Sequence, residues 1–176
     1  MAEVILVTGG ARSGKSTYAL SLAEPFRKRV FVATAEAFDS EMQDRILLHR
    51  AERGPDWETI EAPLELGVAL RENGAHGSVI VVDCLTVWLG NVMYHRAEGF
   101  DETQICHELL DSLDQSKATR IVLVTNEVGM GIVPDNPLAR RFRDVAGRLN
   151  QRIAQRAEQV VLVVCGQPLV IKKTTR

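Results

Sequence analysis

Short runs of β-branched residues alternate with longer amphipathic segments along the chain. Such runs, bounded by polar or small residues, are typical of strands that are buried on both faces of a sheet. The predicted strands cover residues 4–8, 29–33, 79–82, 121–125 and 160–164.

Between these runs, apolar residues recur at helical spacing. The predicted helices cover residues 16–27, 40–53, 63–72, 101–115 and 136–158. Residues 40–43 fit a capping box, and Gly54 with Pro55 ends that helix. Residues 90–100 lack a clear period and are interpreted as the end of a helix followed by a loop. Strands alternating with helices predict an α/β fold with a mainly parallel central sheet flanked by helices.

Length and composition limit the remaining choices. A chain of 176 residues predicts a single domain over 1–176, and 45% hydrophobic with 25% charged residues excludes a disordered protein. The net charge of −2 provides no global field for nucleic acid or an anionic membrane. The apolar runs are too short to insert into a membrane. We therefore expect no nucleic acid partner and no membrane insertion.

The cysteines predict a reducing compartment. The chain has three cysteines, Cys84, Cys106 and Cys165, which lie far apart in the sequence. An odd number of cysteines without a secretory leader argues against a disulfide framework. This pattern favours a cytoplasmic protein.

A phosphate-binding loop follows the first predicted strand and opens the first predicted helix. The pattern G-x-x-x-x-G-K-[ST] is formed by Gly9, Gly10, Ala11, Arg12, Ser13, Gly14, Lys15 and Ser16. Glycines allow backbone amides to surround phosphate oxygens, the lysine reaches the terminal phosphates, and the serine hydroxyl binds Mg²⁺. The alternative is a glycine-rich turn that carries a lysine by chance, which the strand and helix around it disfavour.

Acidic residues follow two other predicted strands. Asp83 after 79–82 is the candidate Walker-B acid for Mg²⁺, and its alternative is an ordinary loop aspartate. Glu127 is a second acid, able to orient a water, a metal ion or an acceptor hydroxyl. In open α/β sheets the ligand lies beyond the carboxyl ends of the strands, so we expect Thr34, Asp83 and Glu127 near the phosphate loop. These features alone predict phosphoryl transfer and leave the acceptor unidentified.

A longer string extends from Val124 through Pro134 as VTNEVGMGIVP. It continues with Asn136, Leu138–Ala–Arg140, Phe142–Arg–Asp144, Ala146–Gly–Arg148 and Asn150–Gln–Arg152. Together with the phosphate loop, it resembles the bifunctional adenosylcobinamide kinase/adenosylcobinamide-phosphate guanylyltransferase family of cobalamin biosynthesis. The resemblance runs from about Ile5 to Gly166.

The resemblance implies a P-loop NTPase of RecA-like type that catalyses two reactions. ATP or GTP phosphorylates the aminopropanol hydroxyl of adenosylcobinamide. A histidine then attacks the α-phosphate of GTP, releases pyrophosphate and passes GMP to the cobinamide phosphate, giving adenosyl-GDP-cobinamide. The resemblance also implies a homotrimer, which the sequence itself does not show.

His49 is the histidine that the resemblance assigns to this role. It lies in a stretch of the form E-M-x-x-R-I-x-x-H-[RK], whereas His76, His95 and His107 match no such pattern. Some relatives carry two adjacent histidines here, and Leu48 stands at the first of these positions. A neutral imidazole suits nucleophilic attack near pH 7. Without the resemblance, a solvated histidine on a charged helix face would be favoured.

Other nucleotide contacts follow from the same resemblance. They are Ala33, Thr34 and Ala35 after the second strand, then His49, Arg50, Ala51 and Glu52, and finally Glu61. An acidic side chain such as Glu61 can accept from the N1 and N2 donors of guanine, and its alternative is a surface glutamate before Pro63. Residues 126–131 are expected beside the nucleotide or the corrinoid. The arginines of 140–152 form a solvated helix face, a phosphate contact or an oligomer interface.

Two other functions stay open at this point. One is a P-loop kinase with a single activity on a small alcohol, in which His49 is structural. The other is a RecA-like regulatory NTPase module that turns over no small substrate.

Overall fold

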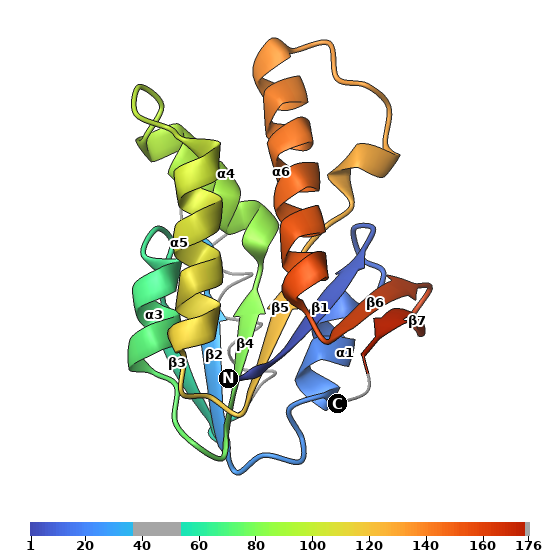
Figure 1. Cartoon of the computed structure of the whole chain (residues 1–176). Helices are drawn as coiled ribbons and strands as arrows, with labels where there is room; N and C mark the ends of the chain where they lie inside the picture. Colours follow the sequence, from blue (N-terminus) through green and yellow to red (C-terminus); the bar gives the residue numbers. More distant parts are fainter. Residues whose placement is uncertain (37–53, 175–176) are drawn as a thin grey trace.

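The computed structural model describes residues 1–36 and 54–174. Within these residues a single sheet has the strand order β3-β2-β4-β5-β1-β6-β7 (Figure 1). The strands are β1 (Glu3–Gly9), β2 (Lys28–Ala33), β3 (Trp57–Glu61), β4 (Ser78–Asp83), β5 (Arg120–Val124), β6 (Gln159–Val164) and β7 (Gln167–Lys173). Neighbours from β3 to β6 pair in parallel, and β7 pairs antiparallel to β6. The predicted mainly parallel sheet is confirmed.

Helices cover both faces of the sheet. The described helices are α1 (Lys15–Ser21), α3 (Leu66–Glu72), α4 (Leu85–His95), α5 (Glu102–Gln115), α6 (Pro137–Arg156) and the 3-10 turn η1 (Val128–Met130). On one face, side chains such as Leu6, Val82 and Leu123 pack against α3, α4, α5 and α6. On the other face, alternate residues such as Val7 and Val124 pack against α1. Because successive strand residues point to opposite faces, continuous apolar runs are what a sheet covered on both sides requires.

Several predicted boundaries were wrong. The helix predicted at 16–27 ends at Ser21 because Pro25 cannot continue a helix and disfavours helical backbone at the residue before it. The helix predicted at 63–72 begins at Leu66, and the one predicted at 136–158 ends at Arg156, after which the chain extends into β6. Residues 90–100 behave as predicted, since α4 ends at His95 and a loop follows. The helix predicted at 40–53 lies outside the described residues.

Two strands were missed. Residues 57–61 form β3, an edge strand whose side chains are half-buried or exposed, so its pattern alternates with polar residues. Residues 167–173 form β7, which returns along β6 after a two-residue turn of Cys165 and Gly166. Both turn residues have positive φ, as a tight hairpin turn requires.

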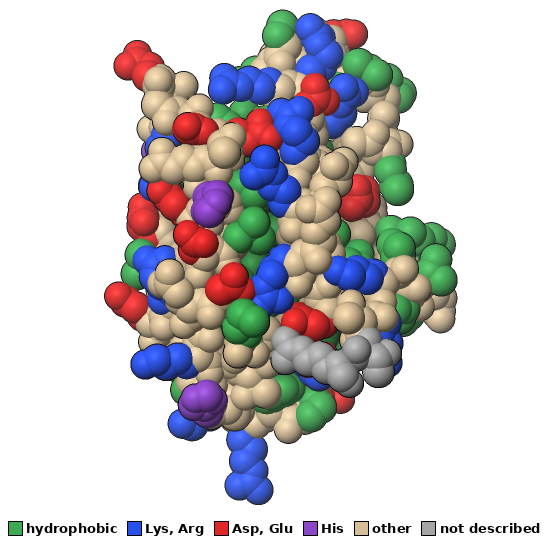
Figure 2. All heavy atoms as spheres, in the orientation of Figure 1, with side chains coloured by type: hydrophobic (Ala, Val, Ile, Leu, Met, Phe, Trp, Pro, Cys, Tyr) green, Lys and Arg blue, Asp and Glu red, His purple; other side chains and the backbone are tan. Residues whose placement is uncertain are grey.

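Charges of both signs mix on the surface over α5 and α6 (Figure 2). Arg148 on α6 donates to Glu102 on α5 at 2.6 Å, and Arg156 donates to Asp114 at 2.7 Å. The hydrogen bond from Arg148 lowers the pKa of the Glu102 carboxyl. The arginine face of α6 is therefore used in part to join the two helices. No helix among the described residues is long and apolar enough to cross a bilayer.

Asn136 caps α6, and its replacement by alanine should lower the free energy of unfolding by about 1 kcal/mol. Its side chain accepts from the N–H groups of Leu138 at 2.8 Å and Ala139 at 3.3 Å, which otherwise lack helical partners. Urea unfolding measures the change. Asn136→Asp retains an acceptor and is the matched control, so equal loss in both variants would contradict the capping role.

Candidate functional site

The phosphate loop joins β1 to α1, and its backbone explains the glycine positions. Gly9 has φ +151 and Gly14 has φ +96, conformations that side-chain-bearing residues rarely adopt. A Cβ atom at Gly9 would lie 2.4 Å from the carbonyl oxygen of Val163 on β6. The loop lies so close to the neighbouring strand that no residue larger than glycine fits at this position.

The turn between β6 and β7 supports the loop from one side. The N–H of Gly166 donates to the carbonyl of Ser13 at 2.8 Å, and a Cβ at Gly14 would lie 3.1 Å from Gly166 Cα. The Ser13 hydroxyl is buried and has no hydrogen-bond partner among the described residues. An unpaired buried hydroxyl in the loop fits a site that completes its hydrogen bonds with a ligand.

Lys15 is the buried cation of the loop. Its side chain is 7% exposed, and Nζ donates to the Gly10 carbonyl at 2.5 Å. Burial lowers the pKa of Lys15, and the nearby Asp83 carboxylate acts in the opposite direction. The structure thus places Asp83 close enough to influence the lysine charge, which is the arrangement expected of a phosphate site with a metal-side acid.

A hydrogen-bond network holds Cys84, the residue after Asp83, against the end of β2. Thr34 Oγ1 donates to the Cys84 carbonyl and accepts from the Cys84 N–H, both at 2.8 Å. Asn91 on α4 donates to the Thr34 carbonyl at 2.8 Å. Burial raises the pKa of Cys84 to about 11, so its thiol stays protonated at neutral pH. Sequence reasoning missed the roles of Cys84 and Asn91, because partners 50 or more residues apart leave no local pattern.

The chain beyond β5 lies beside the phosphate loop. The N–H of Glu127 donates to the Gly9 carbonyl at 3.1 Å, and Thr8 Oγ1 donates to Glu127 Oε1. Asn150 on α6 accepts from the Thr125 hydroxyl at 2.9 Å, which ties this edge to α6. Residues 126–131 therefore start next to the phosphate loop. Their expected contact with the nucleotide or the corrinoid stays a prediction.

Glu61 lies at the far end of the same edge. It pairs in register with Ala33, and the N–H of Ala62 donates to the Ala33 carbonyl at 2.9 Å. The order β3-β2-β4-β5-β1 puts four strand spacings, roughly 19 Å, between Glu61 and the phosphate loop. A guanine contact at the exposed Glu61 side chain thus needs a nucleotide extended along the sheet edge.

Some predicted site residues lie outside the described residues, namely His49, Arg50, Ala51 and Glu52. Their roles stay predictions, as do the nucleotide contacts of Ala33, Thr34 and Ala35. Ser16 and Asp83, both partly buried, carry the hard oxygen ligands that Mg²⁺ prefers. Mg²⁺ keeps several waters and takes further ligands from substrate phosphates, so these two residues fit such an ion. Among residues 1–36 and 54–174, no group of three acidic, His or Cys side chains forms an all-protein metal site.

Most arginines of α6 have partners within the chain. Arg140 donates to the Pro134 and Asp135 carbonyls, Arg141 lies over the Phe100 ring at 5.5 Å, and Arg143 pairs with Asp144 at 3.0 Å. These contacts favour the solvated helix face over a phosphate contact.

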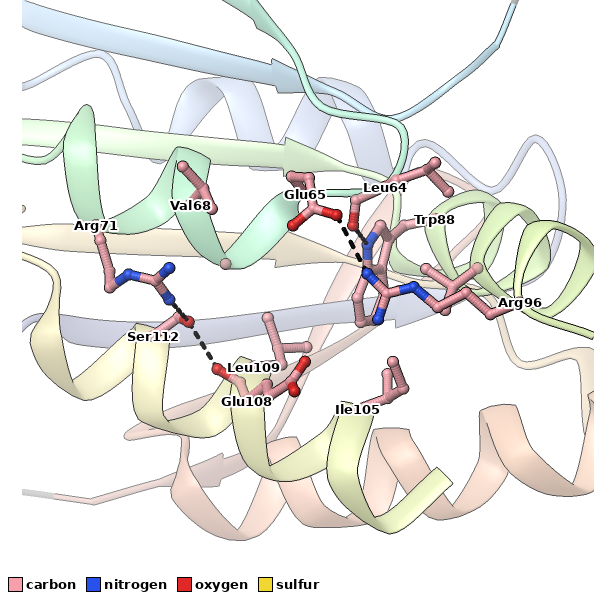
Figure 3. A pocket seen from close by; sticks show the side chains of 12 residues that line it. Leu64, Glu65, Val68, Arg71, Trp88, Arg96, Ile105, Glu108, Leu109 and Ser112 are labelled. Atoms are coloured by element: carbon pink, nitrogen blue, oxygen red, sulfur yellow. Dashed lines mark hydrogen bonds and ion pairs between the residues drawn. The ribbon is translucent and has the colours of Figure 1, made fainter. Parts of the chain in front are cut away.

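A groove of about 140 Å³ lies among α3, α4 and α5 (Figure 3). Its charged side chains are engaged: Arg96 donates to Glu65 at 3.1 Å and Arg71 to Ser112 at 2.6 Å. Its lining residues include neither a residue of the phosphate loop nor Asp83 or Glu127, so the groove is separate from the candidate site.

Comparison with known proteins decides the family. The model of the cobinamide kinase / cobinamide phosphate guanyltransferase family matches residues 5–171. The chain belongs to this family. The bifunctional adenosylcobalamin biosynthesis protein CobP of Pseudomonas aeruginosa is 44% identical over 95% of this chain and 96% of its own length. The protein CobU of Salmonella typhimurium, with the same description, is 39% identical over 96% of this chain and 99% of its own length.

Solved structures support the RecA-like P-loop fold of this family member. The RadB recombinase aligns with a TM-score of 0.54 at 15% identity, covering 91% of this chain and 73% of the recombinase. The P4 protein of bacteriophage phi6, solved with ADP, aligns with a TM-score of 0.52 at 14% identity over 99% of this chain. The chain spans about half of that phage protein, 55% of its length. At such identities the likeness concerns the fold alone.

Proposed function

We propose that this chain phosphorylates adenosylcobinamide with ATP or GTP and then transfers GMP from GTP to adenosylcobinamide phosphate. The product is adenosyl-GDP-cobinamide, an intermediate of cobalamin biosynthesis. The observation that carries the proposal is the family match over residues 5–171, joined by relatives that align over almost their whole length.

The phosphate loop serves the first reaction. Its amides bind the phosphate oxygens, and Lys15 neutralises charge on the terminal phosphate as it moves to the acceptor. Ser16 and Asp83 would hold Mg²⁺, which supplies further charge neutralisation on the phosphates when bound. The close packing of the loop on β6 and on Gly166 supports this role, because a preorganised site needs no rearrangement during the reaction.

The second reaction uses His49 as a covalent carrier. Neutral imidazole attacks the α-phosphorus, the bond to the bridging oxygen breaks, and pyrophosphate leaves. The phosphate of adenosylcobinamide phosphate then attacks the same phosphorus and frees the histidine. In this proposal His49, Arg50, Ala51, Glu52 and Glu61 contact guanosine, while Ala33, Thr34 and Ala35 contact the nucleotide at the end of β2.

The chain acts as one P-loop catalytic domain over residues 1–176 and works in the cytoplasm as a homotrimer. The scattered cysteines support a reducing compartment. Exposed apolar side chains on β7, with Leu169 and Ile171 each 60% exposed, support a contact with another subunit.

The two-step assay tests the function. Purified protein with adenosylcobinamide and ATP should give adenosylcobinamide phosphate, and added GTP should convert it to the GDP derivative, as followed by mass spectrometry. With α-labelled GTP alone, the protein should carry acid-labile, base-stable label. Phosphorylation without label indicates the single-activity kinase, and nucleotide consumption that cobinamide does not stimulate indicates the regulatory module.

A further inference from the structure

We propose that Glu127 is the general base of the phosphorylation step, accepting the proton of the acceptor hydroxyl as the terminal phosphate is transferred. The inference rests on the proposed kinase activity. It assigns to that reaction a catalytic group that the phosphate loop does not supply.

Glu127 lies at the carboxyl-end edge of the sheet, beside the phosphate loop. The strand that precedes it, β5, lies between β4, which ends at Asp83, and β1, which leads into the phosphate loop. The Glu127 N–H donates to the carbonyl of Gly9, the first residue of that loop, at 3.1 Å. The backbone of Glu127 is thus hydrogen-bonded to the phosphate loop, so its side chain begins next to that loop.

The carboxylate is fixed through one oxygen. Thr8, 4% exposed on β1, donates its hydroxyl to Oε1. Within residues 1–36 and 54–174, Oε2 of Glu127 accepts no hydrogen bond and forms no ion pair. The side chain is partly exposed, so a group that arrives from solvent reaches the second oxygen. A carboxylate held by one oxygen and open at the other is suited to accept a proton.

Asp83 and Glu127 have different surroundings. Asp83 acts on the buried ammonium of Lys15, whose Nζ also bonds to the Gly10 carbonyl. Asp83 is therefore the carboxylate that acts on the cation of the phosphate loop. Glu127 contacts a neutral hydroxyl and a backbone carbonyl, which leaves its carboxylate available for the acceptor.

The step balances as follows. The acceptor hydroxyl oxygen forms a bond to the terminal phosphorus, and the bond from that phosphorus to the β,γ-bridging oxygen breaks. The bonding electrons leave with the nucleoside diphosphate. The hydroxyl proton moves to Oε2 of Glu127, which later returns it to solvent.

Guanylyl transfer provides an internal comparison. Its two nucleophiles are an imidazole nitrogen and a phosphate oxygen, and neither carries a hydroxyl proton that must be removed. A base for the kinase step is therefore dispensable for the guanylyl steps. A residue that only shapes the phosphate loop would be needed for both reactions.

Glu127→Gln tests the assignment, because the amide oxygen still accepts from Thr8 but cannot take the proton. We expect kcat for phosphorylation of adenosylcobinamide to fall about 100-fold or more. Labelling by α-labelled GTP, and GMP transfer to supplied adenosylcobinamide phosphate, should stay within about twofold of wild type. Glu98→Gln, at an exposed position in the loop after α4, is the matched control and should leave both activities unchanged.

Three results would overturn the inference: full kinase activity in Glu127→Gln, equal loss of both reactions, or recovery of kinase activity at raised Mg²⁺, which would make Glu127 a metal contact. Retained guanylyl transfer shows that the variant is folded. If wild-type protein does not phosphorylate adenosylcobinamide, the proposed function itself fails, and that result is separate from any effect of the substitution.

Discussion

Lys15→Met is expected to lower kcat for phosphoryl transfer by about 10²–10³, the usual effect of removing one preorganised charge from a transition state. Lys15 is 7% exposed, and its Nζ is held by the Gly10 carbonyl at 2.5 Å, so the ammonium is fixed before substrate binds. Methionine retains the length and apolar stem of lysine but removes the charge. Steady-state kinase assays measure the loss.

The matched control for this variant is Lys28→Met. Lys28 is exposed at the amino-terminal end of β2, away from the carboxyl ends of the strands where the phosphate loop lies. It should leave kcat unchanged. A Lys15→Met protein with normal kcat and only a raised KM would show that the lysine binds ground-state nucleotide without favouring the transition state. Thermal unfolding of both variants separates loss of charge from loss of fold.

Local sequence patterns were sufficient for the central strands. Residues 79–82 and 121–125 are continuous β-branched runs because both faces of their strands are covered, and β4 and β5 include residues from each. Residues 57–61 and 167–173 lie at the two edges of the sheet. Among the residues that the structure describes, each has a partner strand on one side alone, and exposure admits polar residues. Their weaker patterns are the physical reason that β3 and β7 were missed.

The candidate site divides in a similar way. Parallel strands bring their carboxyl ends to one edge, so a glycine-rich loop after β1 and acids after β4 and β5 are expected together once the strands are known. The hydrogen bonds that hold this edge in place are tertiary contacts. Gly166 bonds to Ser13, and Asn91 bonds to Thr34, across long stretches of sequence that no local period connects.

His49→Ala is expected to abolish covalent labelling by α-labelled GTP and the formation of adenosyl-GDP-cobinamide, while phosphorylation of adenosylcobinamide continues. The reason is chemical: alanine has no nucleophilic nitrogen, so no phosphoramidate forms and GMP has no carrier. His76→Ala, at an exposed position before β4, is the matched control and should label as wild type.

The losses of kinase activity and of covalent label in His49→Ala, compared with each other, distinguish a carrier from a nucleotide-binding role of the histidine. A pure carrier is needed only when GMP is held, so its loss leaves the kinase rate intact and removes every trace of label. A histidine that binds nucleotide contributes to both reactions, and its loss raises the KM for the phosphoryl donor as well. Equal loss of both activities in a folded variant would therefore contradict the carrier role, and label that persists would assign the nucleophile to another residue. Because Leu48 offers no neighbouring imidazole in this chain, residual label cannot come from the adjacent position that some relatives fill with histidine.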